Sequence, residues 1–446
     1  MHGVHSARSR RHPWRAHVHS LLLAAGIAVL GHGRAIAGEA PTNASVPTSS
    51  ITLGALFAAA WHRQPEAQAL SAREEAARAR REVANSWTAE PPAVELSTKT
   101  DRINRNAGSR EHEVGIAIPL WLPGERDGVR SLADAESHSV SARVAAAKLR
   151  ISAAVRDAYW SWERARIEVR LATDRLESAR ALAADVARRV GAGDLSRADA
   201  HQAQGNVAAA LGELAERRHA WVAAQQALRA ITGVTLPESA NAADELALGV
   251  VSVPFEVVPP LPPDLGSIDS THPAVTDLLA QAEVARRALD LARTQTRGNP
   301  EVLLATTRDR GQFGDAYQQT VTLGVRIPLG ADARYRSKIA SASAEALEVQ
   351  SRMQLERERV LADLDAARRQ VDLSKARLDA ALERARLARE TRGFYERSFN
   401  AGETDLPMRL RIEFEATEAE RQAGRARIDH AQSISSLRQA LGLLPE

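Results

Sequence analysis

The sequence predicts a mostly helical fold with two β-hairpins of membrane-spanning length, arranged as two internal repeats. The first observation is that residues 129–190 contain neither glycine nor proline. The second is an apolar 4/3 alternation in that interval, the heptad pattern of helices that pack as left-handed coiled coils. The third is a set of landmarks 209 residues apart, which indicates an internal duplication. These pairs are Pro119 and Pro328, Gly193 and Gly402, and Gly233 and Gly442.

The alternation places small and apolar side chains along one side of a helix expected over residues 124–190. Its positions are Ile151, Val155, Ala158, Trp162, Ala165, Val169, Ala172, Leu176, Ala179, Ala183, Val186 and Val190. The second copy of this seam runs from Val360 to Phe399 and is interrupted at Ser374 and Arg392. A helix of this length spans about 100 Å at 1.5 Å per residue. Globular helices run roughly 8–20 residues, so a coiled-coil shaft is expected instead.

Each repeat reads as helix, hairpin, long helix, tight turn and returning helix. The opening helix of the first repeat covers residues 52–87 and is interrupted near Pro65. Period-2 alternation and polar turn residues predict the hairpin strands, which are residues 93–101 and 112–120, then 301–308 and 319–327. The returning helices begin at a capping box, Ser196 to Asp199, and at Pro407.

The first 37 residues have the features of a secretory signal peptide. They combine a basic leader, the apolar run Leu21–Leu30 and the small-residue ending Ala35-Ile36-Ala37. The alternative is a buried helix of the mature fold. The expected division is then a signal peptide, a flexible linker, a first repeat, a Pro-rich connector and a second repeat. These segments are residues 1–37, 38–50, 51–233, 234–264 and 265–446.

Composition excludes several classes of function. The net charge of +3 becomes −2 without residues 1–37, which argues against a nucleic-acid partner. The absence of cysteine excludes disulfides and thiolate sites. The histidines after residue 37 lack metal-ligand spacing. We therefore expect no enzyme activity, no catalytic residue, no bound metal and no cofactor.

The hairpins lead to a prediction about assembly. Each strand has about nine residues, the length a tilted strand needs to cross a bilayer. A sheet of four strands has open edges, and hydrocarbon cannot satisfy their backbone groups. Several chains must therefore contribute to one closed barrel, and the long helices would extend its wall into water. Trp121, at a strand-to-helix junction, fits either a membrane interface or simple packing.

Four segments carry a resemblance to the TolC family of outer membrane efflux channels. They are Val114–Leu120 (VGIAIPL), Leu323–Leu329 (LGVRIPL), Arg189–Leu195 (RVGAGDL) and Phe399–Leu406 (FNAGETDL). The resemblance covers roughly residues 51–444. It implies a homotrimer that forms a 12-stranded barrel in outer membrane lipid, above a periplasmic helical tunnel closed at its inner end by the helix tips.

A narrower resemblance, to the CzcC-type branch, is carried by His272-Pro273, Thr322–Arg334 and Ala401–Leu406. That branch implies efflux of heavy-metal cations, delivered by a periplasmic adaptor and an inner-membrane pump of the resistance-nodulation-division class. The alternatives are a TolC-type duct for drugs or exported proteins, and a periplasmic coiled-coil adaptor.

The candidate gate residues are acidic side chains at the two tips, Asp194, Asp199, Glu403 and Asp405. Rings of carboxylates at a constriction favour cations. The alternative for Asp199 and Asp405 is that they only cap helix N-termini. Some family members carry acids six and nine residues after the second tip glycine. Met408 and Arg411 occupy those positions here, so selectivity is shifted toward the first tip.

Overall fold

The computed structural model describes residues 52–236, 256–260, 271–330 and 332–446. The chain divides into residues 1–44 and residues 45–446, and every described residue belongs to the second unit. The predicted signal peptide (1–37), the linker (38–50) and most of the connector (234–264) lie outside the described residues. They remain predictions.

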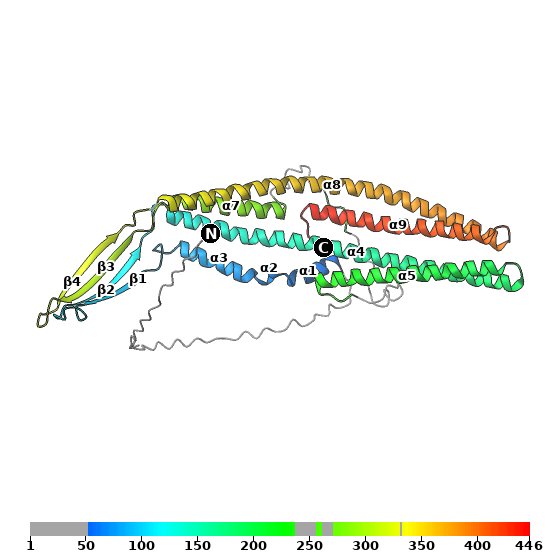
Figure 1. Ribbon diagram of the computed structural model, residues 1–446. Helices are drawn as coiled ribbons and strands as arrows, with labels where there is room; N and C mark the ends of the chain where they lie inside the picture. Colours follow the sequence, from blue (N-terminus) through cyan, green and yellow to red (C-terminus); the bar gives the residue numbers. More distant parts are fainter. Residues whose placement is uncertain (1–51, 237–255, 261–270, 331) are drawn as a thin grey trace, which may run out of the picture. The chain divides into compact units, whose positions relative to one another are not determined.

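The described elements follow the predicted order in both halves (Figure 1). The first half contains α1 (Leu53–His62), α2 (Pro65–Gln68), α3 (Leu70–Ala84), β1 (Ala93–Thr100), β2 (Arg110–Pro119), α4 (Glu125–Ala192) and α5 (Arg197–Thr232). The second half contains α7 (Pro273–Thr294), β3 (Glu301–Arg310), β4 (Gln318–Arg326), α8 (Asp332–Asn400) and α9 (Leu406–Ala440). The expected opening helix is divided into α1, α2 and α3, with Pro65 in the first turn of α2.

Two long helices, α4 and α8, organise the packing. The shorter helices α3, α1 and α5 pack along α4, while α7 and α9 pack along α8. Figure 1 shows α7 and α9 one after the other beside α8. α4 also contacts α7 and α9, so the two halves share one helical body.

The duplicated glycines end the helices. Gly193, Gly233, Gly402 and Gly442 have positive φ angles of 84°, 74°, 77° and 77°. This left-handed conformation carries little steric cost for glycine, and it lets the chain leave the helix while the last carbonyls remain hydrogen-bonded. Gly193 and Gly402 thus lie in the turns that follow the long helices, and Gly233 and Gly442 follow the returning helices α5 and α9.

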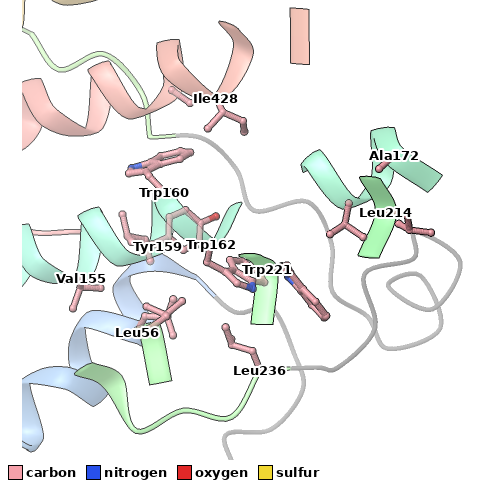
Figure 2. Packing of buried hydrophobic residues seen from close by; sticks show 14 of the residues in the cluster. Leu56, Val155, Tyr159, Trp160, Trp162, Ala172, Leu214, Trp221, Leu236 and Ile428 are labelled. Atoms are coloured by element: carbon pink, nitrogen blue, oxygen red, sulfur yellow. The ribbon is translucent and has the colours of Figure 1, made fainter. Parts of the chain in front are cut away.

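The main core lies where α1, α4, α5 and α9 meet (Figure 2). Tyr159 and Trp160 pack edge to face with ring centroids 5.1 Å apart, and Trp221 of α5 joins the same cluster. Trp162, a seam position, is also buried there. Each buried aromatic ring removes a large apolar area from water, at roughly 25 cal/mol per Å². The predicted seam is therefore the side of α4 that faces the core.

The two seam interruptions are explained by polar partners on α9. Ser374 Oγ lies 2.9 Å from His430 Nδ1 and 2.8 Å from Ser433 Oγ. Arg392 lies 3.5 Å from a Glu413 carboxylate oxygen and 3.4 Å from one of Glu420. Polar groups are tolerated at these seam positions because each is paired across the helix interface.

The described strands form one antiparallel sheet in the order β1-β2-β3-β4. The hairpins were predicted separately, and the structure joins them through β2 and β3. Their register runs from Arg110 opposite Arg310 to Pro119 opposite Glu301. β3 therefore extends to Arg310, two residues beyond its predicted end, because it continues to pair with the start of β2.

Candidate functional site

One face of the sheet is apolar and exposed. A row crosses all four described strands through Val94, Ile116, Leu304 and Leu323, which are directly paired. These side chains are 67%, 44%, 50% and 74% exposed. A neighbouring row contains Leu96, Val114, Thr306 and Val321, and a third contains Ile118, Val302 and Val325. An exposed apolar patch that crosses a whole sheet marks an interaction surface.

The opposite face is polar away from the helices. Because side chains alternate along a strand, the residues between the apolar positions point to this second face. One of its rows contains Ser97, Glu113, Thr307 and Thr320, and another contains Lys99, Glu111, Asp309 and Gln318. Nearer the helices it carries small residues, such as Gly115 opposite Ala305. The sheet thus has one face suited to hydrocarbon and one suited to water.

The sheet has two open edges. Within the described residues, β1 pairs only with β2, and β4 pairs only with β3. Their outer N–H and C=O groups have no strand partner among the residues that the structure describes. Exposed edges are templates for pairing with another strand. Separately, none of the helices within the described ranges is long and apolar enough to cross a bilayer.

The junction between the sheet and the helices is fixed by a buried carboxylate that the sequence analysis did not identify. Glu125, at the start of α4, accepts hydrogen bonds from the Leu122 N–H at 3.0 Å and from Asn299 Nδ2 at 2.6 Å. Its other oxygen accepts one from Gln295 Nε2 at 2.8 Å. Asn299 and Gln295 lie in the segment before β3, so Glu125 links the first half of the chain to the second half beside the sheet.

Two tryptophans flank this junction. Trp121 donates its indole N–H to the Ser86 carbonyl oxygen at 3.3 Å, so its ring packs on the end of the preceding helical segment. The sequence predicted that Trp87 ends the opening helix, without assigning it a role. Its side chain is 94% exposed. Trp87 lies six residues before the start of β1. Tryptophan is enriched at membrane–water interfaces.

The first tip contains Asp194 and Asp199. Asp194 follows the glycine turn and is exposed, and its backbone N–H donates to the Arg189 carbonyl oxygen at 2.9 Å. Asp199 completes the predicted capping box, because its carboxylate accepts from the Ser196 hydroxyl at 2.7 Å and from the Ser196 N–H at 2.9 Å. These hydrogen bonds hold the pKa of the Asp199 carboxyl below its ordinary value.

The second tip contains Glu403 and Asp405. Asp405 caps α9 by accepting from the Met408 N–H at 3.1 Å. Glu403 is exposed, and its N–H donates to the Ser398 carbonyl oxygen at 3.0 Å. Asp199 and Asp405 therefore cap helices. Asp194 and Glu403 are exposed and cap no helix, and the Glu403 carboxylate accepts a hydrogen bond from the Ser398 hydroxyl at 3.4 Å. Arg411, at one of the positions where some family members carry an acid, pairs with Glu415 at 3.5 Å.

The two tips contact each other through an arginine that sequence reasoning missed. Arg189 of α4 donates to the Phe399 carbonyl oxygen at 2.9 Å and to the Asn400 carbonyl oxygen at 3.2 Å. Its guanidinium also lies 4.6 Å from the centroid of the Phe399 ring. The two acceptors are the last carbonyls of α8, where a positive charge is favourable. Beneath this contact, Val186, Ala203, Phe399 and Leu406 form a small core.

A search of the described ranges finds no group of three or more His, Asp or Glu residues placed to hold a metal ion. The described histidines are dispersed. His112 lies in β2, His272 at the start of α7 and His430 in α9.

Comparison with protein families identifies a match over residues 56–234 to the outer membrane efflux protein model. Among curated proteins, the cobalt-zinc-cadmium resistance protein CzcC of Cupriavidus metallidurans is 27% identical over 285 residues. That alignment covers 64% of this chain and 65% of the relative, slightly less than two thirds of its length.

Solved structures share the fold. CusC, described with conformational changes accompanying folding and transmembrane channel formation, matches with a TM-score of 0.70 and 14% identity. The match covers 88% of this chain and 92% of CusC. The open state of the Neisseria gonorrhoeae MtrE outer membrane channel matches with a TM-score of 0.67 and 17% identity, covering 88% and 89% of the two chains. At these identities the likeness concerns the fold alone.

Proposed function

The chain belongs to the outer membrane efflux protein family, and we propose that it is the passive exit duct of a tripartite efflux system. Its location is the outer membrane, with the helical part in the periplasm. In the proposed role, the sheet contributes to the membrane barrel and the helices α4, α5, α8 and α9 contribute to the wall of the tunnel.

The observation that carries this proposal is the sheet with one exposed apolar face and two open edges. The apolar rows suit contact with lipid, and the opposite face suits a water-filled lumen. In hydrocarbon, each unpaired backbone group costs several kcal/mol. The outer edges of β1 and β4 therefore need strands from other copies. Three copies with four strands each give the 12-stranded barrel expected from the family resemblance.

A row of exposed apolar side chains on α8 supports the same assembly. Leu355, Leu373, Leu387 and Phe394 are 66%, 66%, 49% and 61% exposed. Their spacings of 18, 14 and 7 residues are close to whole numbers of helical turns, so they share one side of α8. The opposite side carries the buried Val360, Leu364 and Val371. We assign the exposed row to contact with a neighbouring copy.

The proposed substrates are heavy-metal cations, delivered by an inner-membrane pump of the resistance-nodulation-division class and a periplasmic adaptor. Two observations support this choice. One is the name of the curated relative, a cobalt-zinc-cadmium resistance protein. The other is the pair of solvent-facing acids at the tips, Asp194 and Glu403, which three copies would repeat around the lumen. Carboxylate rings raise the local concentration of cations.

The tip hypothesis is tested by planar-bilayer conductance of the double variant Asp194→Asn/Glu403→Gln, which removes the two tip acids that do not cap a helix. We expect reduced cation preference, measured as a shift of the reversal potential in a salt gradient. Asp199→Asn/Asp405→Asn is the matched control, because it removes the same number of charges from the two capping positions. Unchanged selectivity in the first variant would remove Asp194 and Glu403 as the filter, and a shift in the control alone would assign the filter to the capping acids.

The substrate is tested by deleting the gene and measuring growth inhibition by cobalt, zinc, cadmium and hydrophobic drugs. We expect greater sensitivity to the metals, restored by a plasmid copy of the chain. Sensitivity to drugs alone would instead support a duct of the drug-exporting kind. Unchanged sensitivity to both classes of compound would count against a role in either form of resistance.

A further inference from the structure

Two buried arginines meet where the first and second halves join. Arg156 comes from α4, and Arg438 comes from α9. Both contact Glu256, in the described stretch 256–260 of the connector. The side chains of Arg156, Arg438 and Glu256 are only 3%, 8% and 7% exposed. This cluster, the two-arginine pocket, lies outside the sheet and the tips described above.

Glu256 is held at both carboxylate oxygens. Oε1 lies 2.8 Å from Arg156 Nη2 and 3.1 Å from Arg438 Nε. Oε2 accepts a hydrogen bond from the Ser435 hydroxyl. Arg156 and Ser435 donate hydrogen bonds to the carboxylate, and such charged hydrogen bonds are about twice as strong as neutral ones. Arg438 Nε contacts it as an ion pair without hydrogen-bond geometry. The arrangement of two guanidinium groups and one hydroxyl around two oxygens is that of a carboxylate-binding site.

The arginines are oriented by the helices themselves. Arg156 Nη1 donates to Ser152 Oγ at 2.7 Å, to Gln439 Oε1 at 2.6 Å and to the Leu443 carbonyl oxygen at 3.0 Å. Its Nε donates to Ser435 Oγ at 3.1 Å. All these partners belong to α4, to α9 or to the turn after α9. The donors that face Glu256 are therefore positioned by the fold and not by the connector alone.

The two buried arginines need a buried negative charge beside them. The other acid that contacts Arg438 is Glu446, whose side chain is 83% exposed and thus largely screened by water. Glu256 is the buried anion between the two cations. Removing one partner of a buried ion pair leaves an uncompensated charge in a poorly solvated site, which is strongly destabilising.

We propose that the two-arginine pocket is a carboxylate receptor, filled by Glu256 of the same chain, that holds residues 256–260 across α4 and α9. Val257 adds a second attachment, because its carbonyl oxygen accepts from Arg438 Nη1 at 3.2 Å. This segment links the long helix of the first half to the last helix of the second half. Without the Glu256 side chain, the pocket takes a small monocarboxylate such as formate or acetate. This inference does not depend on the proposed transport function.

The test is thermal unfolding of the full chain in detergent, comparing wild type with Glu256→Ala. We expect the midpoint to fall by about 5 °C or more, because two buried cations lose their counter-charge. Formate or acetate should restore at least half of that loss, while chloride at equal ionic strength should not. Larger carboxylates such as benzoate should be less effective, since the space left is that of a carboxymethyl-sized side chain.

Glu283→Ala is the matched control. Glu283 also pairs with two arginines, Arg286 and Arg287, but on an exposed part of α7. Its loss should change the midpoint little, and formate should add nothing specific. Equal responses of the two variants to formate, or a Glu256→Ala midpoint equal to wild type, would overturn the proposal.

A second variant covers the case in which Glu256→Ala does not fold. Glu256→Gln keeps the side-chain volume but not the charge, so it should lower the midpoint without responding to formate, because the amide still fills the pocket. An unchanged midpoint in Glu256→Gln would show that the carboxylate charge is not what the pocket binds, and would overturn the proposal on its own.

Discussion

The sheet and the two-arginine pocket are opposites in what they expose. The sheet presents Leu304, Leu323 and other apolar side chains to its surroundings and leaves two edges unpaired. The pocket hides Arg156, Arg438 and Glu256 and satisfies their charges within one chain. A globular protein in water would normally do the reverse, with apolar groups inside and charges outside.

The difference shows where each region obtains its stability. The helical core is completed by contacts between the two halves of the chain. Within the described residues the sheet has an exposed apolar face and two open edges. In the proposed assembly these gain their partners from lipid and from other copies. Changes in the pocket should therefore alter the folding of each chain, whereas changes on the sheet should alter membrane insertion and assembly.

The largest effect is expected from a charge on the apolar sheet face. Leu304→Arg should reduce the amount of protein in the outer membrane severely, because an arginine facing lipid costs about 2–4 kcal/mol near the bilayer midplane. Thr322→Arg is the matched variant, since Thr322 lies on the neighbouring strand but on the opposite face. It should insert normally. Immunoblots of separated membrane fractions measure both, and equal loss of the two variants would mean that the faces are wrongly assigned.

A smaller effect is expected on α8. Leu387→Glu should weaken the association of copies, because the exposed apolar row loses about 1–2 kcal/mol of burial per chain and gains a charge. Gln370→Glu adds the same charge to an exposed position of α8 outside the row. Analytical ultracentrifugation in detergent should show dissociation of the first variant only. Dissociation of both would indicate a general charge effect instead of a specific interface.

The smallest effect concerns the first tip and its dependence on pH. The pKa of Asp199 is depressed by Ser196, so the capping box contributes stability above the ordinary pKa of 3.8. That stability is lost as the pH falls through the lower pKa of the folded state. In the wild type, acidification should therefore accelerate amide hydrogen exchange at the start of α5, after correction for the intrinsic rate. The acceleration should be larger than in Asp199→Asn. Equal pH dependence in the variant would exclude this role.

The sequence predicted those parts of the fold that depend on local patterns. The ends of α4 were predicted to within two residues. Gly193 and Ser196 marked the turn after it, because helix caps depend on residues that are neighbours in the sequence. The repeated spacing then predicted the second half from the first. The hairpins were recognised for the same reason, since alternation and turn residues are contiguous in the chain.

Long-range pairings could not be predicted in this way. The pairing of β2 with β3 joins segments nearly 200 residues apart, and no local signal specifies it. Arg156, Arg189 and Glu125 looked like ordinary surface charges on amphipathic helices. Their roles emerge only when the second half supplies their partners. For the tips, the sequence identified the acids and the capping alternative, and the gate assignment remains a prediction.

The central claim is that one chain supplies only part of a closed membrane barrel. Native mass spectrometry of the protein extracted from outer membranes tests it most directly. We predict that the particle contains three copies of the chain and that the chain is absent from the soluble periplasmic fraction. A single copy per particle, recovered from the periplasm without detergent, would contradict the account.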